Sequence, residues 1–155
     1  MAEFTHIRGD KVQMVDISEK DDVVREAVAE GRIRLREATQ SAIREGTLVK
    51  GNVLATARVA AILAVKETPR IIPLCHPIPL SGIDVDFDYG EGSIRATVRV
   101  RSRGPTGVEM EALTGVSVAL LTIWDMVKSA EKDAAGQYPE TGIDGIRVIE
   151  KWKGK

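Results

Sequence analysis

The 155-residue sequence has little of several residue types, and each shortage excludes a class of protein. It has one cysteine, so no internal disulfide can form, which is typical of a reducing compartment. The formal net charge is −1, which argues against a general nucleic-acid binder. Polar residues interrupt the best apolar run, 116–127, and residues 1–11 lack the apolar segment of a secretory signal. We therefore expect a cytoplasmic protein with no membrane or nucleic-acid partner.

What the chain does contain is an interleaving of strand-like and helix-like segments. Only 4% of the residues are aromatic, so the core must be aliphatic. We expect a flexible arm at 1–13, a single catalytic domain at 14–155, helices at 39–45, 51–65 and 112–130, strands at 32–36, 83–89, 94–100 and 146–152, a hairpin turn at 90–92 and a loop at 138–145. The helix from 51 should end before Pro69, because proline disrupts a helix. This order predicts an α+β fold in which helices cover one face of one sheet.

Residues 72–81 contain three of the six prolines, the cysteine and one of the two histidines. Three prolines in seven positions remove three backbone donors, so the segment can be neither a helix nor a central strand. A rigid apolar segment of this kind would hold the imidazole of His76 in a fixed place. A buried connector whose histidine only satisfies a neighbouring carbonyl explains the pattern equally well.

The long predicted helix contains an acidic residue at a position where its apolar pattern predicts a buried one. Asp125 lies in an otherwise apolar stretch, and Lys128 follows three residues later on the same helical face. A buried pair of this kind can transfer protons, because burial and mutual charge tune both pKa values. A helix end that emerges into solvent explains the same residues.

Other charged residues are weaker candidates. Glu109 and Glu111 would converge in an extended segment, but acids at the start of a helix are the more economical interpretation. Lys50 before a helix, with Arg58 beyond it, is compatible with a phosphate site, although the glycine-rich pattern of a P-loop is missing. Arg101 and Arg103 are candidate anion ligands, but a strand end exposed to solvent explains their charge equally well. Metal catalysis has little support: Cys75 and His76 are adjacent, and His6 lies in the arm.

Six motifs carry a resemblance to a known family. They are Met-Val-Asp-Ile-Ser (14–18), Lys-Gly-Asn-Val (50–53), Ala-Thr-Ala-Arg (55–58), Ile-Pro-Leu-Cys-His-Pro (72–77), Thr-Gly-Val-Glu-Met-Glu-Ala-Leu-Thr (106–114) and Leu-Thr-Ile-Trp-Asp-Met-Val-Lys (121–128). In this order they resemble the cyclic pyranopterin monophosphate synthases, the molybdenum cofactor biosynthesis protein C family. The resemblance covers residues 14 to about 132.

The resemblance implies an activity and an assembly. Members convert 3′,8-cyclo-7,8-dihydro-GTP into cyclic pyranopterin monophosphate and diphosphate, without a metal or redox cofactor. They have a ferredoxin-like α+β subunit and form a homohexamer, a trimer of dimers, with sites at subunit contacts. By motif, Asp125 and Lys128 would be the catalytic acid–base pair and Lys50 a further catalytic lysine. The substrate would be bound by Leu74, Cys75, His76, Met110, Glu111, Glu109 and Arg58.

The chain departs from the family pattern in two places. Many members have Lys-Gly-Asp where this chain has Asn52, so no carboxylate role is assigned there. The stretch after Asp133 matches less well. The chemistry needs repeated proton transfers, which a Lys–Asp pair can perform if both pKa values are shifted towards neutrality. Two other functions compete: a non-catalytic, ligand-binding regulatory module and a metal-dependent phosphohydrolase.

Overall fold

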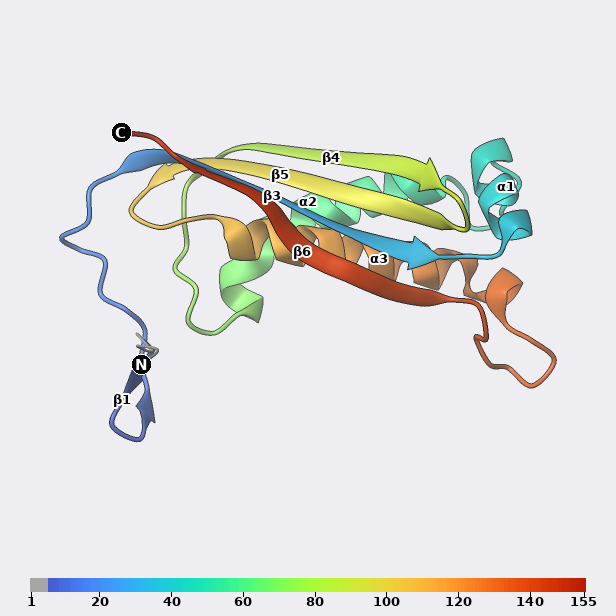
Figure 1. Cartoon of the computed structure of the whole chain (residues 1–155), viewed down its shortest axis with the longest axis horizontal. Helices are drawn as coiled ribbons and strands as arrows, with labels where there is room; N and C mark the ends of the chain where they lie inside the picture. Colours follow the sequence, from blue (N-terminus) through green and yellow to red (C-terminus); the bar gives the residue numbers. More distant parts are fainter. Residues whose placement is uncertain (1–5) are drawn as a thin grey trace.

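Two long helices lie along one face of a four-stranded sheet (Figure 1). The computed structural model describes residues 6–155. The elements are β1 (Ile7–Arg8), β2 (Lys11–Val12), β3 (Val23–Arg34), α1 (Glu37–Glu45), α2 (Val53–Ile71), β4 (Leu80–Gly90), β5 (Ser93–Gly104), α3 (Glu109–Glu131) and β6 (Gly142–Lys153). The sheet order is β4-β5-β3-β6, and every pair is antiparallel. The α+β class and the covering of one sheet face by helices are therefore confirmed.

The alternation along β5 separates the core from solvent. Ile94, Ala96, Val98 and Val100 are buried towards α2 and α3, whereas the alternate positions on the outer face hold arginines and Thr97. The buried hydrophobic residues are Ala, Val, Ile, Leu and Met; within 6–155 none is aromatic. The aliphatic core is thus as the composition predicted. The β4–β5 hairpin is also confirmed, with both strands longer than predicted.

The first long strand, β3, begins nine residues before the predicted strand at 32–36. The alternation of apolar inward-facing and polar outward-facing residues, which would indicate a strand, is interrupted at Val28. This residue faces the outer side of the sheet and is nevertheless buried. Gly31 does not interrupt the strand but is required for packing. A Cβ atom there would lie 2.9 Å from side-chain carbons of Val116 and Ile146, so glycine lets β3 approach α3 and β6 closely.

The prediction that the second helix ends before Pro69 is wrong, because α2 continues through Pro69 to Ile71. A proline in the last turn removes only one backbone hydrogen bond, the one towards Val65. The turn is kept by the backbone N–H of Ile72, which donates to the Thr68 carbonyl at 2.9 Å. Burial of Val65 and Thr68 against the core favours the extra turn.

The end of the chain is more regular than expected. Strand β6 starts at Gly142, so the predicted loop at 138–145 is wrong for its last four residues. Ile143 pairs with Ile33 of β3, which extends the ladder, and β6 is the edge strand that the pattern predicted. Helix α1 ends as predicted at Gly46, whose φ of 71° is the left-handed conformation that glycine adopts readily.

The remaining predictions concern the arm and the longest helix. Residues 1–5 of the predicted arm lie outside the described residues, while β1 and β2 form a small hairpin; its flexibility stays a prediction. By length and composition α3 is able to cross a membrane, unlike the shorter run seen in the sequence. Its buried residues pack against α2, β3 and β5, so it is the central helix of the core.

Candidate functional site

Three predicted catalytic side chains meet near the C-terminal half of α3. Lys128 Nζ lies 2.9 Å from Asp125 Oδ1, on the next turn of the helix. Lys50 reaches the same carboxylate from the loop before α2, with Nζ 3.4 Å from Asp125 Oδ2 and 3.1 Å from the Asp125 backbone oxygen. Gly51, with a φ of 98°, allows the chain to turn between Lys50 and the helix. We call Lys50, Asp125 and Lys128 the acid–lysine cluster.

Of the two interpretations of Asp125, the buried pair is wrong for the isolated chain and the solvent-exposed position is the one observed, since the Asp125 side chain is 61% exposed. The helix turns this position away from the sheet, although Trp124 and Met126 on either side pack inwards. Hydrogen bonds from Lys128 and Lys50 lower the pKa of Asp125. The hydrogen bond and charge of Asp125 raise the pKa of Lys128. Both shifts lead away from neutrality, so both groups are charged in the isolated chain and form a solvent-exposed ion pair.

Six of the predicted substrate-binding residues line one cavity of about 280 Å³ at the other end of α3. They are Leu74, Cys75, His76, Glu109, Met110 and Glu111, and the lining is completed by His6, Val15, Ile17, Lys20, Ile78, Thr106 and Gly107. We call this the histidine cavity. Residues 72–79 form no helix or strand, as the prolines predicted, and bring His76 opposite the first turn of α3. His6, which the sequence placed in a remote arm, lies in the wall of the same cavity.

The two glutamates of the histidine cavity differ electrostatically. Glu111 is only 3% exposed, and burial raises its pKa, with a further contribution from Glu109. Burial would also raise the pKa of Glu109, but the hydrogen bond and charge of Lys151 outweigh it, so the net shift is downwards. Glu109 Oε1 lies 2.5 Å from Lys151 Nζ. The site therefore holds one firmly ionised carboxylate beside one that retains its proton more readily.

The chemistry of Cys75 argues against a nucleophilic role. Burial raises the pKa of this thiol, and the nearby charge of Glu111 raises it further. A reactive cysteine needs the opposite shift, because the thiolate is the nucleophile. Cys75 is therefore part of the cavity wall, which is the role that the family resemblance implied.

A second, larger cavity of about 790 Å³ adjoins the histidine cavity. The two share Lys20, Thr106, Gly107 and Glu109 in their walls. The larger one carries five cationic side chains, and we call it the basic cavity; these are Lys20, Arg25, Lys151, Lys153 and Lys155. These residues were not predicted from the sequence. The available signal was the alternation of lysine at the end of the chain, which places Lys151, Lys153 and Lys155 on one side of an extended segment.

One chain does not bring the two predicted groups together. Asp125 follows Glu111 by fourteen positions on the same helix, which corresponds to about 21 Å along the axis. Arg58 joins neither group: its Nε donates to the Val85 carbonyl at 3.0 Å, and its guanidinium lies 5.8 Å from the centre of the Phe87 ring. Asn52 is the N-cap of α2, since its Oδ1 accepts from the Ala55 N–H at 3.0 Å.

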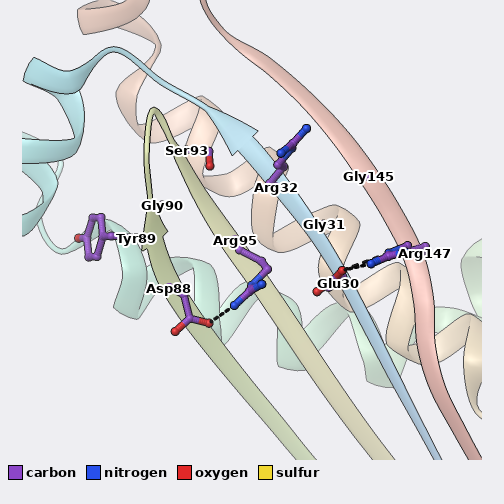
Figure 2. Close-up of a pocket in the computed structure, with 10 residues that line it drawn as sticks. All are labelled: Glu30, Gly31, Arg32, Asp88, Tyr89, Gly90, Ser93, Arg95, Gly145 and Arg147. Carbon is purple, nitrogen blue, oxygen red and sulfur yellow. Dashed lines mark hydrogen bonds and ion pairs between the residues drawn. The ribbon is translucent and has the colours of Figure 1, made fainter.

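A third cavity, of about 510 Å³, lies on the outer face of the sheet and contains none of the predicted site residues (Figure 2). Its charges are matched across the strands: Arg95 Nη2 lies 3.4 Å from Asp88 Oδ2, and Arg147 Nη2 lies 2.9 Å from Glu30 Oε1. Arg101, a candidate anion ligand in the sequence, pairs on the same face with Asp84 at 2.8 Å. Cross-strand pairing explains these arginines.

The described residues give no indication of a metal centre. Between residues 6 and 155, no three His, Cys, Asp or Glu side chains gather as ligands.

Comparison with known proteins gives a consistent result along the whole chain. The family model described as the MoaC family matches residues 14–154. A protein of Methanoregula boonei named probable cyclic pyranopterin monophosphate synthase is 74% identical over 155 residues, all of both chains. Proteins with the same name are 71% identical in Methanosphaerula palustris, over 99% of this chain and 100% of the relative, and 63% identical in Pyrococcus abyssi, over 97% and 94%.

Proposed function

The chain belongs to the MoaC family, and on that premise we propose that it is a cytoplasmic enzyme of molybdenum cofactor biosynthesis that forms cyclic pyranopterin monophosphate. Its substrate in this proposal is 3′,8-cyclo-7,8-dihydro-GTP, and the second product is diphosphate. The observation that carries the proposal is the joining of the histidine cavity to the basic cavity in a chain 74% identical to a protein named as such a synthase.

The two cavities match the two ends of this substrate. The guanine-derived ring presents N–H groups, for which carboxylates such as Glu111 and Glu109 are suitable acceptors. The triphosphate needs cations, and the basic cavity supplies Lys20, Arg25 and Lys151 within one connected surface. Closing a cyclic phosphate with departure of diphosphate relies mainly on positioning and on charge stabilisation. His76 borders the same surface and would contact the substrate between its two ends.

Proton transfer falls to the acid–lysine cluster. Rearrangement of the ribose-derived carbons into a pyran ring needs groups that both accept and donate protons. Asp125 and Lys128 lie 2.9 Å apart and can exchange a proton once their environment is less aqueous. A second subunit would supply that environment by covering the cluster, because desolvation raises the pKa of a carboxyl group and lowers that of an ammonium group. Lys50 would keep Asp125 in place.

A shared site also accounts for the distance between the clusters. A small ligand cannot span about 21 Å of helix, so the acid–lysine cluster of one subunit would meet the histidine cavity of another. Exposed apolar residues near the cluster favour this contact: Leu121, one turn before Asp125, is 58% exposed, and Val49 beside Lys50 projects fully into solvent. We propose that the assembly is a homohexamer, a trimer of dimers.

The subunit fold is assigned to the ferredoxin-like class as part of this proposal. The main elements β3, α2, β4, β5, α3 and β6 follow the order β-α-β-β-α-β that defines the class. In this arrangement α3 starts beside the histidine cavity and ends beyond the acid–lysine cluster.

The test is incubation of the purified protein with 3′,8-cyclo-7,8-dihydro-GTP, with and without a chelator. We expect equal amounts of diphosphate and of a pterin that becomes fluorescent on oxidation, in both conditions. Turnover that needs added divalent ions would favour the phosphohydrolase alternative instead. Tight binding of the substrate without any product would favour the regulatory module.

A further inference from the structure

Glu109 lies between the two connected cavities, because it lines both the histidine cavity and the basic cavity. It is the first residue of α3, and Lys151 reaches it from β6, with Nζ 2.5 Å from Glu109 Oε1. The Glu109 side chain is 26% exposed and that of Lys151 is 55% exposed. One cation of the basic cavity is therefore paired with a carboxylate before any anion binds.

The loop before α3 fits this carboxylate closely. A Cβ atom at Gly107 would lie 2.8 Å from Glu109 Cδ, so a larger residue at this position would displace the carboxylate. Arg25 holds the same loop from β3: its Nε donates to the Gly104 carbonyl at 3.1 Å, and its Nη2 donates to the Pro105 carbonyl at 3.2 Å. The loop therefore keeps the Glu109 carboxylate in one place at the boundary between the cavities.

The pairing distinguishes Lys151 from the other cations of the basic cavity. Within residues 6–155, none of these others forms an ion pair with a carboxylate; they are Lys20, Arg25, Lys153 and Lys155. A phosphate oxygen can approach them directly. To contact Lys151, an incoming anion must first take the place of Glu109.

We propose that Glu109 is an internal counter-ion for Lys151: a polyphosphate displaces it on binding in the basic cavity, and it pairs with Lys151 again when diphosphate leaves. The proposal rests on the function proposed above, which supplies a triphosphate substrate and a diphosphate product. A polyphosphate competes well with one carboxylate, because it has more charge and more acceptor oxygens. Once released, the Glu109 carboxylate is available to N–H groups in the histidine cavity.

The exchange limits how tightly the basic cavity holds diphosphate. Five cations around one small anion would retain it, and slow product release limits the turnover of many enzymes. A carboxylate that competes for Lys151 weakens the binding of the product without a change in the shape of the cavity. Lys151 also lowers the pKa of Glu109, so this carboxylate is ionised at neutral pH and the competition is always present.

The test measures the binding of inorganic diphosphate by isothermal titration calorimetry. Glu109→Gln keeps the size of the side chain and removes its charge. We expect the affinity for diphosphate to rise by about 5-fold, because Lys151 is no longer paired and the anion no longer meets a like charge. In protein that already carries Lys151→Gln, the same substitution should raise the affinity by no more than about 2-fold, since only the like charge is then removed.

Glu30→Gln is the matched control. Glu30 pairs with Arg147 at 2.9 Å on the outer face of the sheet and is 17% exposed, so the substitution removes the same charge from a comparable pair outside the basic cavity (Figure 2). Its affinity for diphosphate should equal that of the wild type.

Three results would overturn the proposal: an unchanged affinity in Glu109→Gln, an equal gain in Glu30→Gln, or a gain that persists in full without Lys151. Absence of diphosphate binding in every variant would overturn it as well. The calorimetry needs no turnover, so it is independent of the activity assay. If the expected affinities are found but no product forms from 3′,8-cyclo-7,8-dihydro-GTP, the proposed function fails and the exchange at Lys151 stands.

Discussion

Lys50 and Asp125 connect the two long helices at their exposed side: Lys50 Nζ donates to both the backbone oxygen and the carboxylate of Asp125, at 3.1 and 3.4 Å. The residues are 75 positions apart, so the contact depends on the packing of α2 against α3. The pairing of the two lysines with one carboxylate fixes the geometry of the acid–lysine cluster before any substrate binds.

Asp125→Asn and Lys128→Met test the proton-transfer role. Each should lower product formation by about 10²- to 10⁴-fold, the usual contribution of a general acid or base. Both side chains are exposed in the subunit, so the midpoint of thermal unfolding should stay close to that of the wild type. Near-normal turnover in either variant would remove that residue from the mechanism.

Glu111→Gln and Glu109→Gln should change stability in opposite directions. Burial raises the pKa of Glu111 in the folded state, so the folded protein holds this proton more tightly than the unfolded chain. The free energy of unfolding therefore falls as the pH rises from the unfolded-state pKa of Glu111 to its higher folded-state pKa. Glu111→Gln removes this pH-dependent loss of stability. We therefore expect the free energy of unfolding to rise by on the order of 1 kcal/mol at neutral pH and to stay unchanged at acid pH.

Glu109 has a lowered pKa, so its stabilising contribution is present above the unfolded value and is lost as pH falls through the folded value. Glu109→Gln should therefore cost about 0.5 kcal/mol at neutral pH, as expected for a half-exposed pair with Lys151. Urea unfolding of both variants at a series of pH values measures the two effects. Shifts of the same sign would contradict the electrostatic description of the histidine cavity.

Lys151→Gln tests the basic cavity. Loss of one cation should raise KM by about 10-fold, because charge-assisted contacts to phosphate are strong, and should weaken the salt dependence of kcat/KM. Arg95→Gln, in the outer-face cavity, is the matched loss of a positive charge and should leave KM unchanged. An equal effect of both substitutions would mean that only the net charge matters.

Glu131→Ala tests the anchor of residues 132–141, the loop between α3 and β6. The side chain is fully buried and accepts hydrogen bonds from Arg36 and Thr141, so its removal should cost about 3 kcal/mol in urea unfolding. Glu140, whose side chain is 62% exposed and pairs with Arg36 at 2.8 Å, is the control; Glu140→Ala should change stability by about 0.5 kcal/mol or less. A small effect of Glu131→Ala would show that the loop is held by other contacts.

Mixing of inactive variants tests whether sites are shared. Asp125→Asn and Glu111→Gln are each expected to be inactive, but the proposed hexamer, when it contains both variants, would hold some sites with two intact halves. Co-expression in equal amounts should restore about one quarter of the wild-type activity. Each of the two half-sites comes from a subunit that is intact for that half in about half of the cases, and both must be intact. A mixture that remains inactive would place all catalytic residues of a site in one subunit.

The sequence predicted the fold class and much of the candidate site, for identifiable reasons. The proline pattern of 72–81 was sufficient to predict the irregular segment 72–79, although Leu80 and Ser81 begin the edge strand β4, and the alternation in β4 and β5 was sufficient to predict a hairpin. Pro69 misled the helix boundary because propensity is local, whereas burial of Val65 and Thr68 is tertiary. The start of β3 was missed because Val28 is buried on the outer face. The exposure of Asp125 depends on the helix rotation relative to the sheet, which the apolar composition of α3 concealed.

Contacts between distant segments could not be predicted. Lys151 meets Glu109 because the end of β6 lies beside the start of α3, and Tyr138 meets Trp124 because the loop between α3 and β6 returns to the helix. No local pattern contains this information. The family motifs predicted residues that would contact substrate, but not the distant segments that pack beside them.

The spacing of the two clusters along α3 has a consequence for the cell. If sites are shared between subunits as proposed, an isolated folded chain carries two halves of different sites and no complete one, because a buried helix cannot bend to bring its own ends together. Specific activity would then depend on protein concentration, falling on dilution while circular dichroism stays constant. Synthesis of too little protein would silence the pathway step abruptly rather than in proportion, and expression level would act as a threshold control.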